Sequence, residues 1–282
     1  MLGNEFYHIS DLKEACLLLE KKVNEAKIIA GGTDLMVEIN RRKIFPQALI
    51  YIGDLGLSYI KNNENNLIIG ATTTHADVVN SKIASEHIPL LVEACRSIGS
   101  PAIRNMATIG GNLCTSSPAG DACVALLALD ARLKVVSSNR ERIIDIEKFF
   151  IGRKENVLLP DELLKEIIIP INSTNKKWAW YKQGQRKAQA ISVVSIAVNL
   201  VMDRKICKEV RVALGAVAPL PILINEPRSI LEGKEISKDL IEEFASRAAD
   251  ETSCIDDIRS KGWYRKKICG VMINRLLSKI IM

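Results

Sequence analysis

Two pairs of adjacent glycines are the residues of this chain that most suggest chemistry, because each pair directly follows a short apolar run. The first lies in Ala30-Gly31-Gly32-Thr33-Asp34-Leu35, behind AKII, and the second is Gly110-Gly111 in the segment ATIGGNL. A Gly-Gly turn lets the backbone take positive φ and removes both side chains, so that successive N–H groups can converge on an anion. Either pair alone could serve a plain turn. Two such turns, each beside a threonine, favour a ligand with two phosphates, and a pyrophosphate is the natural candidate.

The common nucleotide-binding fingerprints do not occur in the sequence. No GxGxxG follows the first predicted strand and no GxxxxGK[ST] is found, so the chain is neither Rossmann-like nor a P-loop protein. Asp121 starts the predicted helix AGDACVALLALD, where an acid stabilises the helix N-terminus and can accept hydrogen bonds from ribose hydroxyls. A plain cap for the helix is an equal alternative at this position.

Catalytic side chains are not indicated. The three histidines are isolated from one another, no GxSxG elbow is found and no carboxylate pair stands out. His75, in ATTTHADVV, is predicted to be a helix-start residue. We therefore predict a protein without catalytic or metal-ligating residues of its own, in which a bound dinucleotide cofactor carries the chemistry.

The predicted elements place both glycine pairs between an extended segment and a helix. A helix in DLKEACLLLEKK, capped by Ser10 or Asp11, is followed by the strand AKIIA, a helix in DLMVEINRRK and the strand ALIYIGD. A second region contains a hairpin in SYIKNNENNLIIGA, a helix from Pro89 to Gly99 that Pro101 breaks, the helix of Asp121, the strands ARLKVVSS and RIIDI, and a strand in DELLKEIIIP.

The polar stretch INSTNKK is predicted to be a linker to a third part. There, the strands AISVVSIAVNLVMD and KEVRVALGAVA are followed by helices in SKDLIEEFASRAADE and WYRKKICGVMINRLLSK. Strands that come first and helices that come afterwards indicate an antiparallel sheet with helices packed on one side.

Composition and cysteine usage indicate which partners and which cellular compartment to expect. The chain has 282 residues, 48% hydrophobic content and a net charge of +6, but its basic residues are interleaved with acids and only 5% of residues are aromatic. This argues against a nucleic-acid partner. The seven cysteines form no CxxC and are predicted to be buried thiols in a reducing compartment. With no secretory leader in MLGNEFYHISDLKEAC and no run able to span a bilayer, we expect a cytoplasmic protein without membrane insertion.

Five segments together resemble the FAD-binding subunit of molybdenum hydroxylases, the group that includes xanthine dehydrogenase, nicotinate dehydrogenase and aerobic carbon monoxide dehydrogenase flavoproteins. They are KIIAGGTDLM, the run from Ile98 through IRNMATIGGNLCTSSPAGDACVALLALDA, DELLKEIIIP, WYKQGQRKAQAIS and DIRSKGWYRKKI. The resemblance implies an α+β protein with a two-subdomain FAD-binding fold of the vanillyl-alcohol oxidase type, at 1–57 and 58–172, and a C-terminal antiparallel-sheet-and-helix domain at 173–282.

The resemblance also implies the cofactor contacts. The first turn around the pyrophosphate would be Ile28, Ile29, Ala30, Gly31, Gly32, Thr33, Asp34 and Leu35, and the second Thr108, Ile109, Gly110, Gly111 and Asn112. Asp121 would hold the ribose side of the adenosine, Leu164 would contact the flavin ring through its backbone, and Lys182 would lie near the ring's polar edge. Ile98 occupies the position where some relatives stack an aromatic ring on the flavin. Here either Tyr181 or a neighbouring group shields the ring, or that face stays open.

The implied enzyme is a heterotrimer in which this chain binds FAD. A partner subunit carries [2Fe-2S] clusters, a second partner carries the molybdopterin cofactor, and NAD⁺ is the expected acceptor. Xanthine or another N-heterocycle is the expected substrate. Two alternatives stay open: a stand-alone flavin reductase or oxidase of the same fold, and a scaffold subunit that has lost its flavin.

Overall fold

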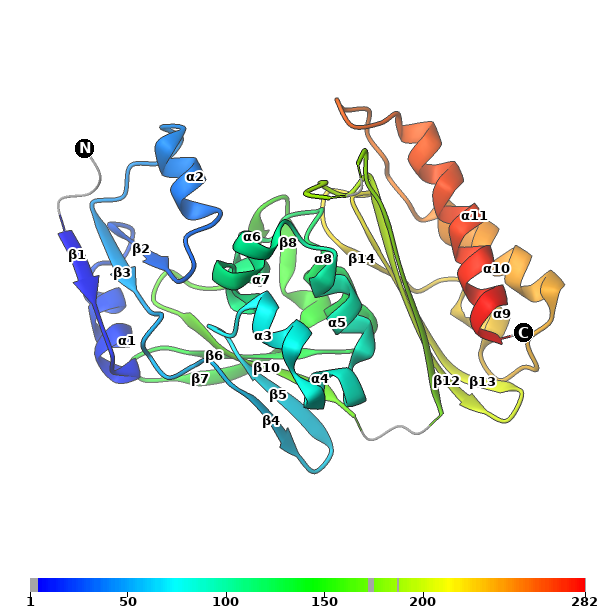
Figure 1. Ribbon diagram of the computed structural model, residues 1–282, viewed down its shortest axis with the longest axis horizontal. Coiled ribbons are helices and arrows are strands. Elements are labelled where there is room, and N and C mark those ends of the chain that lie inside the picture. Colours follow the sequence, from blue (N-terminus) through cyan, green and yellow to red (C-terminus); the bar gives the residue numbers. More distant parts are fainter. Residues whose placement is uncertain (1–4, 172–174, 187, 282) are drawn as a thin grey trace.

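The protein, described by a computed structural model, contains a three-stranded, a five-stranded and a four-stranded sheet and a small two-stranded ribbon. The three larger sheets follow one another along the long axis of the molecule, in chain order from the N-terminal to the C-terminal part (Figure 1). The structure describes residues 5–171, 175–186 and 188–281. The predicted α+β class with a C-terminal sheet-and-helix domain is confirmed. Part of the expected linker, residues 172–174, lies outside the described residues, as do the first four residues on which the leader prediction partly rests.

The first part is a parallel sheet with strand order β1-β3-β2. Its elements are β1 (Glu5–His8), α1 (Leu12–Lys21), β2 (Ala26–Ile29), α2 (Leu35–Asn40) and β3 (Ala48–Tyr51). Asp11, one of the two residues expected as the cap, caps α1 by accepting a hydrogen bond from the Glu14 N–H at 2.8 Å. Helix α2 has no buried residue, so it projects from the sheet instead of packing tightly on it. The first glycine pair lies directly before this exposed helix.

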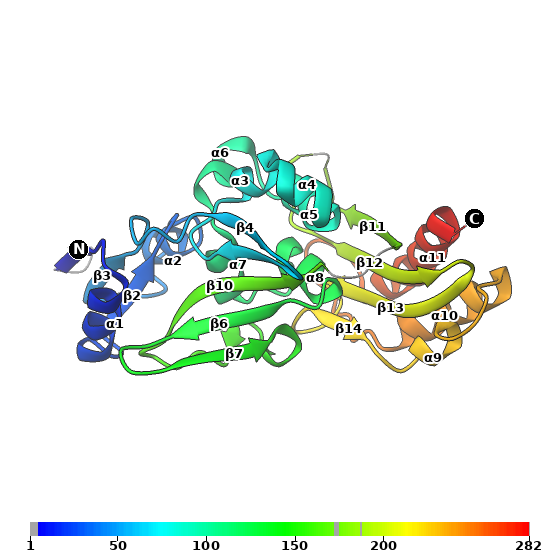
Figure 2. The same ribbon diagram turned by 90° about the horizontal axis from the view of Figure 1, so that it is seen from below.

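The second part has an antiparallel sheet with strand order β4-β5-β10-β6-β7. The sheet strands are β4 (Ile60–Asn63), β5 (Asn66–Gly70), β6 (Arg132–Val136), β7 (Glu141–Asp145) and β10 (Leu163–Pro170), and β8 (Phe150–Gly152) pairs with β9 (Glu155–Asn156). The helices are α3 (His75–Asn80), α4 (Lys82–His87), α5 (Pro89–Arg96), α6 (Pro101–Met106), α7 (Ile109–Thr115) and α8 (Asp121–Ala128), with a short 3₁₀ turn at Ile146–Lys148. Figure 2 shows the helices α3 to α6 above the strands of this sheet.

The third part has an antiparallel sheet with strand order β11-β12-β13-β14. Its elements are β11 (Lys176–Gln183), β12 (Val194–Asp203), β13 (Ile206–Gly215), β14 (Ile222–Ile224), α9 (Arg228–Leu231), α10 (Lys238–Asp250) and α11 (Gly262–Ile281). Helices α10 and α11 lie on one side of β12 and β13, while α5 and α8 lie on the other side (Figure 1). The predicted strand pair followed by helices on one face is confirmed.

Helix α8 joins the second part to the third. All eight of its residues are buried, which is typical of a helix that is covered on every side. Close packing depends on Gly215 at the end of β13, where an added Cβ would lie 2.6 Å from a methyl group of Val124. The Ala216 N–H donates to the Pro118 carbonyl at 2.7 Å across the same junction. The start of α8 is therefore fixed against the C-terminal sheet.

Two local predictions were wrong and one was incomplete. The helix that begins at Pro89 ends before Pro101 as expected, but Pro101 also occupies the first turn of the separate helix α6. The segment ATIGGNL is not an extended run with a turn: Thr108 caps α7, and both glycines lie inside that helix. Cys114 is exposed and Cys254 is half-buried, whereas the other five cysteines are buried as expected.

Within the described residues, no helix is long and apolar enough to cross a membrane.

Candidate cofactor-binding site

The loop between β2 and α2 offers a run of unused backbone donors. Within the described part of the chain, the N–H groups of residues 31 to 35 donate to no acceptor. Gly32 has φ of 69°, in the left-handed region that favours glycine, which turns the chain sharply at this point. Asp34 precedes α2 without capping it through its side chain. Consecutive free N–H groups at such a turn form an anion-binding concavity, so the chemistry predicted for the first glycine pair fits its structure.

The second glycine segment lies directly against this loop. A Cβ added to Gly31 would overlap the carbonyl oxygen of Met106 and would lie 3.2 Å from the Ala107 nitrogen, so only glycine allows the approach. The Thr115 hydroxyl donates to the Asp34 carboxylate at 3.2 Å, which ties the end of α7 to the same loop. The structure thus brings together the two segments that the sequence analysis paired.

The second pair differs from the first in how its donors are used. The Gly110 N–H donates to the Ala71 carbonyl at 2.9 Å, and the Gly111 N–H donates to the Thr108 hydroxyl at 3.0 Å. Neither glycine has a positive φ, so this pair does not use the left-handed conformation that glycine allows. Gly110 is instead needed for packing, because an added Cβ would lie 2.6 Å from the Ala71 oxygen. The pair therefore lets α7 pack closely on the strand ends, while Gly111 remains exposed.

Asp121 and Lys182 form an ion pair between α8 and β11. Lys182 Nζ lies 2.6 Å from Asp121 Oδ2, and the two side chains are only 12% and 4% exposed. Burial raises the pKa of the Asp121 carboxyl, and hydrogen bonds from Lys182 and Ser192 act in the opposite direction. Ser192, which the sequence analysis did not single out, donates from its hydroxyl to Asp121 Oδ1 at 2.6 Å. Both carboxylate oxygens are thus satisfied within the chain.

The same lysine contacts the segment of Ile98. Lys182 Nζ donates to the Ser97 carbonyl at 2.8 Å, one residue before Ile98, whose side chain is half-buried. An ammonium group has three donors, and the third has no acceptor among the described residues. Asp121, Lys182 and the Ile98 segment are therefore neighbours. An extended FAD cannot place its adenosine ribose on Asp121 and its flavin ring on Lys182 at the same time, so the two expected roles conflict.

The side chains of Tyr181 and Leu164 pack in two different apolar cores. Tyr181 packs into the core of the C-terminal domain, and successive side chains of a strand point to opposite faces, so it lies on the other face of β11 from Lys182. The suggestion that Tyr181 covers the ring in place of an aromatic residue at position 98 does not fit this orientation. Leu164 is buried in β10 opposite Val135 of β6, and its side chain belongs to the core of the second part.

The sequence contained partial signals for the residues that were missed. Ser192 is the last residue of the quoted segment WYKQGQRKAQAIS, and Ser97 directly precedes Ile98. His75 begins α3 as predicted, capped by Thr74, and it is fully buried. Burial lowers the pKa of His75 to about 4, and its Nε2 atom has no partner among the described residues. This histidine is thus neutral near neutral pH.

These features fit a phosphate-bearing cofactor. The loop of residues 31 to 35 supplies free N–H donors for phosphate oxygens, and Lys182 supplies a charged donor for a polar group of the ligand. Neither group is a general base or a nucleophile in the arrangement seen, so the site can bind and orient a redox cofactor. The fold and the site together define the class of a protein that binds a phosphate-bearing cofactor.

Comparisons with known proteins identify the family. Residues 3–172 match the family described as FAD binding domain in molybdopterin dehydrogenase, and residues 179–280 match the CO dehydrogenase flavoprotein C-terminal domain. The chain is 34% identical to the nicotinate dehydrogenase FAD-subunit of Eubacterium barkeri, over 98% of this chain and 96% of that protein. It is 29% identical to the glyceraldehyde dehydrogenase medium chain of Sulfolobus acidocaldarius, over 99% of this chain and 100% of that protein.

A solved structure gives the same result. A chain of the carbon monoxide dehydrogenase from Hydrogenophaga pseudoflava superimposes with a TM-score of 0.95 at 27% identity, covering 99% of this chain and 97% of that one. The chain belongs to the family of FAD-binding subunits of molybdenum hydroxylases, and its cofactor is FAD. The resemblance seen in the sequence motifs is thereby confirmed.

Proposed function

We propose that this chain is the FAD-binding electron-transfer subunit of a three-part molybdenum hydroxylase, placed between a subunit with [2Fe-2S] clusters and the acceptor NAD⁺. The observation that carries the proposal is the run of free N–H donors from Gly31 to Leu35, held against the α6–α7 segment. When bound, FAD supplies the redox chemistry, because a flavin can exchange electrons one at a time or as a hydride. The cytoplasmic location stays part of the proposal and rests on the cysteine usage of the sequence.

Each predicted contact residue receives a role in this proposal. Residues 28 to 35 bind the pyrophosphate through the loop N–H groups, and Thr108 to Asn112 form the adjoining wall, with Asn112 and exposed Gly111 facing the ligand. Leu164 contacts the flavin through its backbone. Lys182 donates its remaining N–H to the ring's polar edge. We revise the role of Asp121: it orients Lys182 instead of binding the adenosine ribose, because the two groups are 2.6 Å apart.

The division of the chain at 57 and 172 also belongs to the proposal. It is supported by three clusters of buried apolar residues, each centred on one part of the chain. The cluster of the first part also contains Val136 and Leu163 of the five-stranded sheet, and the cluster of the second part also contains Ala197, Ala213 and Leu223 of the C-terminal sheet. The first two parts therefore share a packed boundary, as expected for two subdomains that hold one cofactor.

An N-heterocycle is the proposed substrate class of the molybdenum subunit. Support comes from similarity to the nicotinate dehydrogenase subunit at 34% identity, and from the relatives named nicotine 6-hydroxylase medium subunit and caffeine dehydrogenase subunit beta, at 29% identity each. We include xanthine in this class, because a putative xanthine dehydrogenase FAD-binding subunit of Escherichia coli is 26% identical.

FAD titration of the purified apoprotein tests the cofactor site. We expect one FAD to bind per chain, and Gly32→Ala to weaken binding at least ten-fold because φ of 69° would be strained and the loop donors displaced. Gly233→Ala is the matched control: Gly233 has φ of 76° and open space around it, but lies far along the chain in the C-terminal domain. Equal loss of FAD binding in both variants would contradict the proposed loop.

A second experiment tests the acceptor. Anaerobic addition of NADH to the FAD-loaded chain should bleach the visible flavin absorbance, since hydride transfer is reversible. Failure of NADH to reduce the bound flavin, while dithionite does, would remove NAD⁺ from the proposal. Co-purification with partner subunits that carry [2Fe-2S] clusters and molybdopterin would support the role as a subunit, whereas purification without them would support the stand-alone reductase. A chain that binds no FAD would support the flavin-free scaffold.

A further inference from the structure

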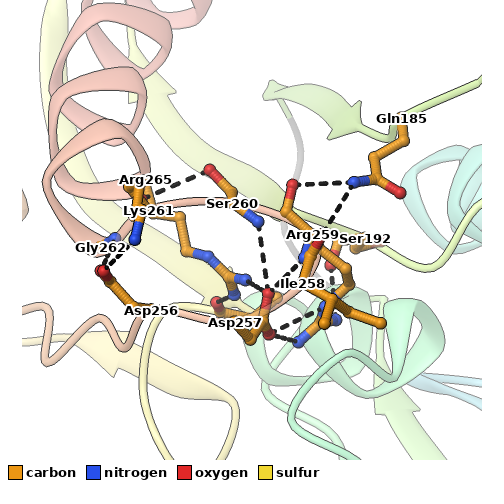
Figure 3. A network of polar contacts seen from close by, with 11 residues as sticks. Gln185, Ser192, Asp256, Asp257, Ile258, Arg259, Ser260, Lys261, Gly262 and Arg265 are labelled. Atoms are coloured by element: carbon orange, nitrogen blue, oxygen red, sulfur yellow. Dashed lines mark hydrogen bonds and ion pairs between the residues drawn. The ribbon is translucent and has the colours of Figure 1, made fainter.

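The C-terminal segment DIRSKGWYRKKI has a role that the FAD-binding loops do not explain. Its first residues form a tight turn closed by a bridge between Asp257 and Ser260. The Asp257 carboxylate accepts hydrogen bonds from the Arg259 N–H at 2.8 Å, the Arg259 guanidinium at 2.6 Å and the Arg265 guanidinium at 2.5 Å (Figure 3). Arg265 is 1% exposed and donates to the Ala216 carbonyl at 2.7 Å. The turn is therefore anchored to the end of the C-terminal sheet.

The Asp257 carboxylate is paired with two guanidinium groups. Partial burial acts to raise the pKa of Asp257, but the hydrogen bonds from Arg259 and Arg265 lower that pKa well below the usual range. Asp257 thus remains ionised wherever the protein is folded at ordinary pH. A permanently charged carboxylate with two guanidinium partners is a rigid anchor.

The turn holds both ends of the connection between β11 and β12. Near the first end, Gln185 Nε2 donates to the carbonyls of Ile258 at 3.3 Å and Arg259 at 3.0 Å. Near the second end, Arg259 Nη1 donates to the Ser192 carbonyl at 2.9 Å. Figure 3 shows Gln185 and Ser192 on the same side of the turn, both directed at it. The position of Ser192 is therefore set by Arg259.

Ser192 connects the turn to the ion pair of the cofactor site. Its carbonyl accepts from Arg259, and its hydroxyl donates to Asp121 Oδ1 at 2.6 Å. The other oxygen of Asp121 contacts Lys182 Nζ at 2.6 Å. A continuous chain of polar contacts thus runs from buried Arg265 to Lys182, across elements that are distant in sequence.

We propose that Arg259 and Ser192 are positioning residues for the Asp121–Lys182 pair, and that the DIRS turn exists in this subunit to hold Lys182 toward the cofactor. This inference rests on the proposed FAD site. Arg259 contacts no group of the proposed site other than Ser192 among its hydrogen-bond partners in the described residues, so its effect on FAD must pass through Ser192 and Asp121.

A double-mutant cycle on FAD affinity tests the proposal. The Kd of FAD is measured by titration of the apoprotein for the wild type, Arg259→Met, Lys182→Met and the double variant. We expect Arg259→Met to raise the Kd about ten-fold in the wild-type background. The increase should be less than two-fold when Lys182 is already replaced, because the interaction through which Arg259 acts is then already absent. Lys261→Met is the matched control, since Lys261 lies in the same motif, its side chain is 68% exposed, and it pairs with Asp256.

Ser192→Ala provides a milder test that does not depend on a charged residue. The hydroxyl of Ser192 lowers the pKa of Asp121. FAD affinity should be lost below the pH at which Asp121 becomes protonated, and removal of the hydroxyl should move this pH limit to a higher value. The other ionisable groups that face this carboxylate are Lys182 on β11, Cys95 on α5 and Cys123 on α8 itself. A purely structural defect would lower the affinity at every pH without moving this limit.

The outcomes separate the two proposals. If the wild-type chain binds no FAD, the proposed function fails. If the wild type binds FAD but Arg259→Met binds it equally well, or is weakened by the same factor in both backgrounds, the positioning role is refuted. An unchanged pH limit in Ser192→Ala refutes it as well.

Discussion

Replacement of Lys182 by Met should destabilise the protein in a way that depends on pH. Lys182 is 12% exposed and Asp121 is 4% exposed, so the substitution leaves a carboxylate buried with Ser192 as its remaining side-chain partner. Removal of one partner of a buried ion pair costs about 3 to 5 kcal/mol, because the other charge stays desolvated. The lost hydrogen bond to the Ser97 carbonyl adds to this cost. We expect the free energy of unfolding to fall by about 3 kcal/mol at pH 7.

The penalty should shrink in acid, because Asp121 can take up a proton. Burial already raises the pKa of Asp121, and loss of Lys182 removes the group that opposes the rise. Between the ordinary pKa of an aspartate and this raised value, the folded variant binds more protons than the unfolded chain, so its stability increases as the pH falls. The wild type, whose pair is intact, should show a smaller gain over the same range.

Urea unfolding of the apoprotein at pH 7 and at pH 5 measures both effects. Lys208→Met is the control, since Lys208 pairs with Asp203 at 3.4 Å with both side chains more than half exposed, and such pairs are worth less than about 1 kcal/mol. The double variant Lys182→Met/Asp121→Asn should recover part of the loss, because no buried charge remains. The reasoning is refuted if Lys182→Met loses no more stability than Lys208→Met, or if its loss is the same at both pH values.

Three further predictions concern other parts of the molecule. Burial lowers the pKa of His75 to about 4, so the unfolded chain takes up a proton at a higher pH than the folded protein does. The free energy of unfolding of the wild type should therefore fall by roughly 3 kcal/mol as the pH falls from 6.5 to 4. His75→Leu should abolish this pH dependence, as measured by urea unfolding. Gly31→Ala should cost about 2 kcal/mol or more, because its Cβ overlaps the Met106 carbonyl. Gly270→Ala should be neutral or stabilising, because Gly270 lies inside α11 and its added Cβ would meet atoms of α10 no closer than 3.5 Å. Equal melting temperatures of the two variants would contradict this. Arg211→Met should lower the free energy of unfolding by about 2 kcal/mol. The Arg211 side chain is 8% exposed, and its guanidinium donates to the Leu127 carbonyl and to Glu147 at the junction of α8 and β13. A change below about 0.5 kcal/mol would show that the junction does not depend on Arg211.

Sequence patterns predicted the elements that have strong periodicity. Helices α1, α10 and α11 and the strand pair β12–β13 carry long apolar patterns, and each was found where it was expected. The strand β1 and the helices α4 and α6 were missed, because they have only four to six residues and too few apolar positions to show a period. The segment ATIGGNL was misread because Thr108 supplies a cap that outweighs the low helix propensity of the glycines.

The site could be predicted only in part, since its contacts join distant segments. Both glycine pairs and Lys182 were identified from motifs, but spacing along the chain gives no information on whether Lys182 and Asp121 meet. They are 61 positions apart and belong to different domains. The same holds for Ser192 and Asp121, which are 71 positions apart. Side-chain pairing of this kind depends on how α8 packs against the C-terminal sheet, and local propensity contains nothing about that packing.

We propose that the two glycine pairs differ in function, because an N–H group that donates to an anion cannot also donate to an acceptor within the protein. Among the described residues the N–H groups of residues 31 to 35 have no acceptor, so the loop gains little stability from its own hydrogen bonds, and α2 behind it buries no residue. Its shape must therefore be imposed from outside. The second glycine segment does this through close contact of Met106 with Gly31 and through the bond from Thr115 to Asp34. Gly110 and Gly111 donate to acceptors within the protein, which fixes α7 as a support for the loop whose free donors we propose to bind the cofactor.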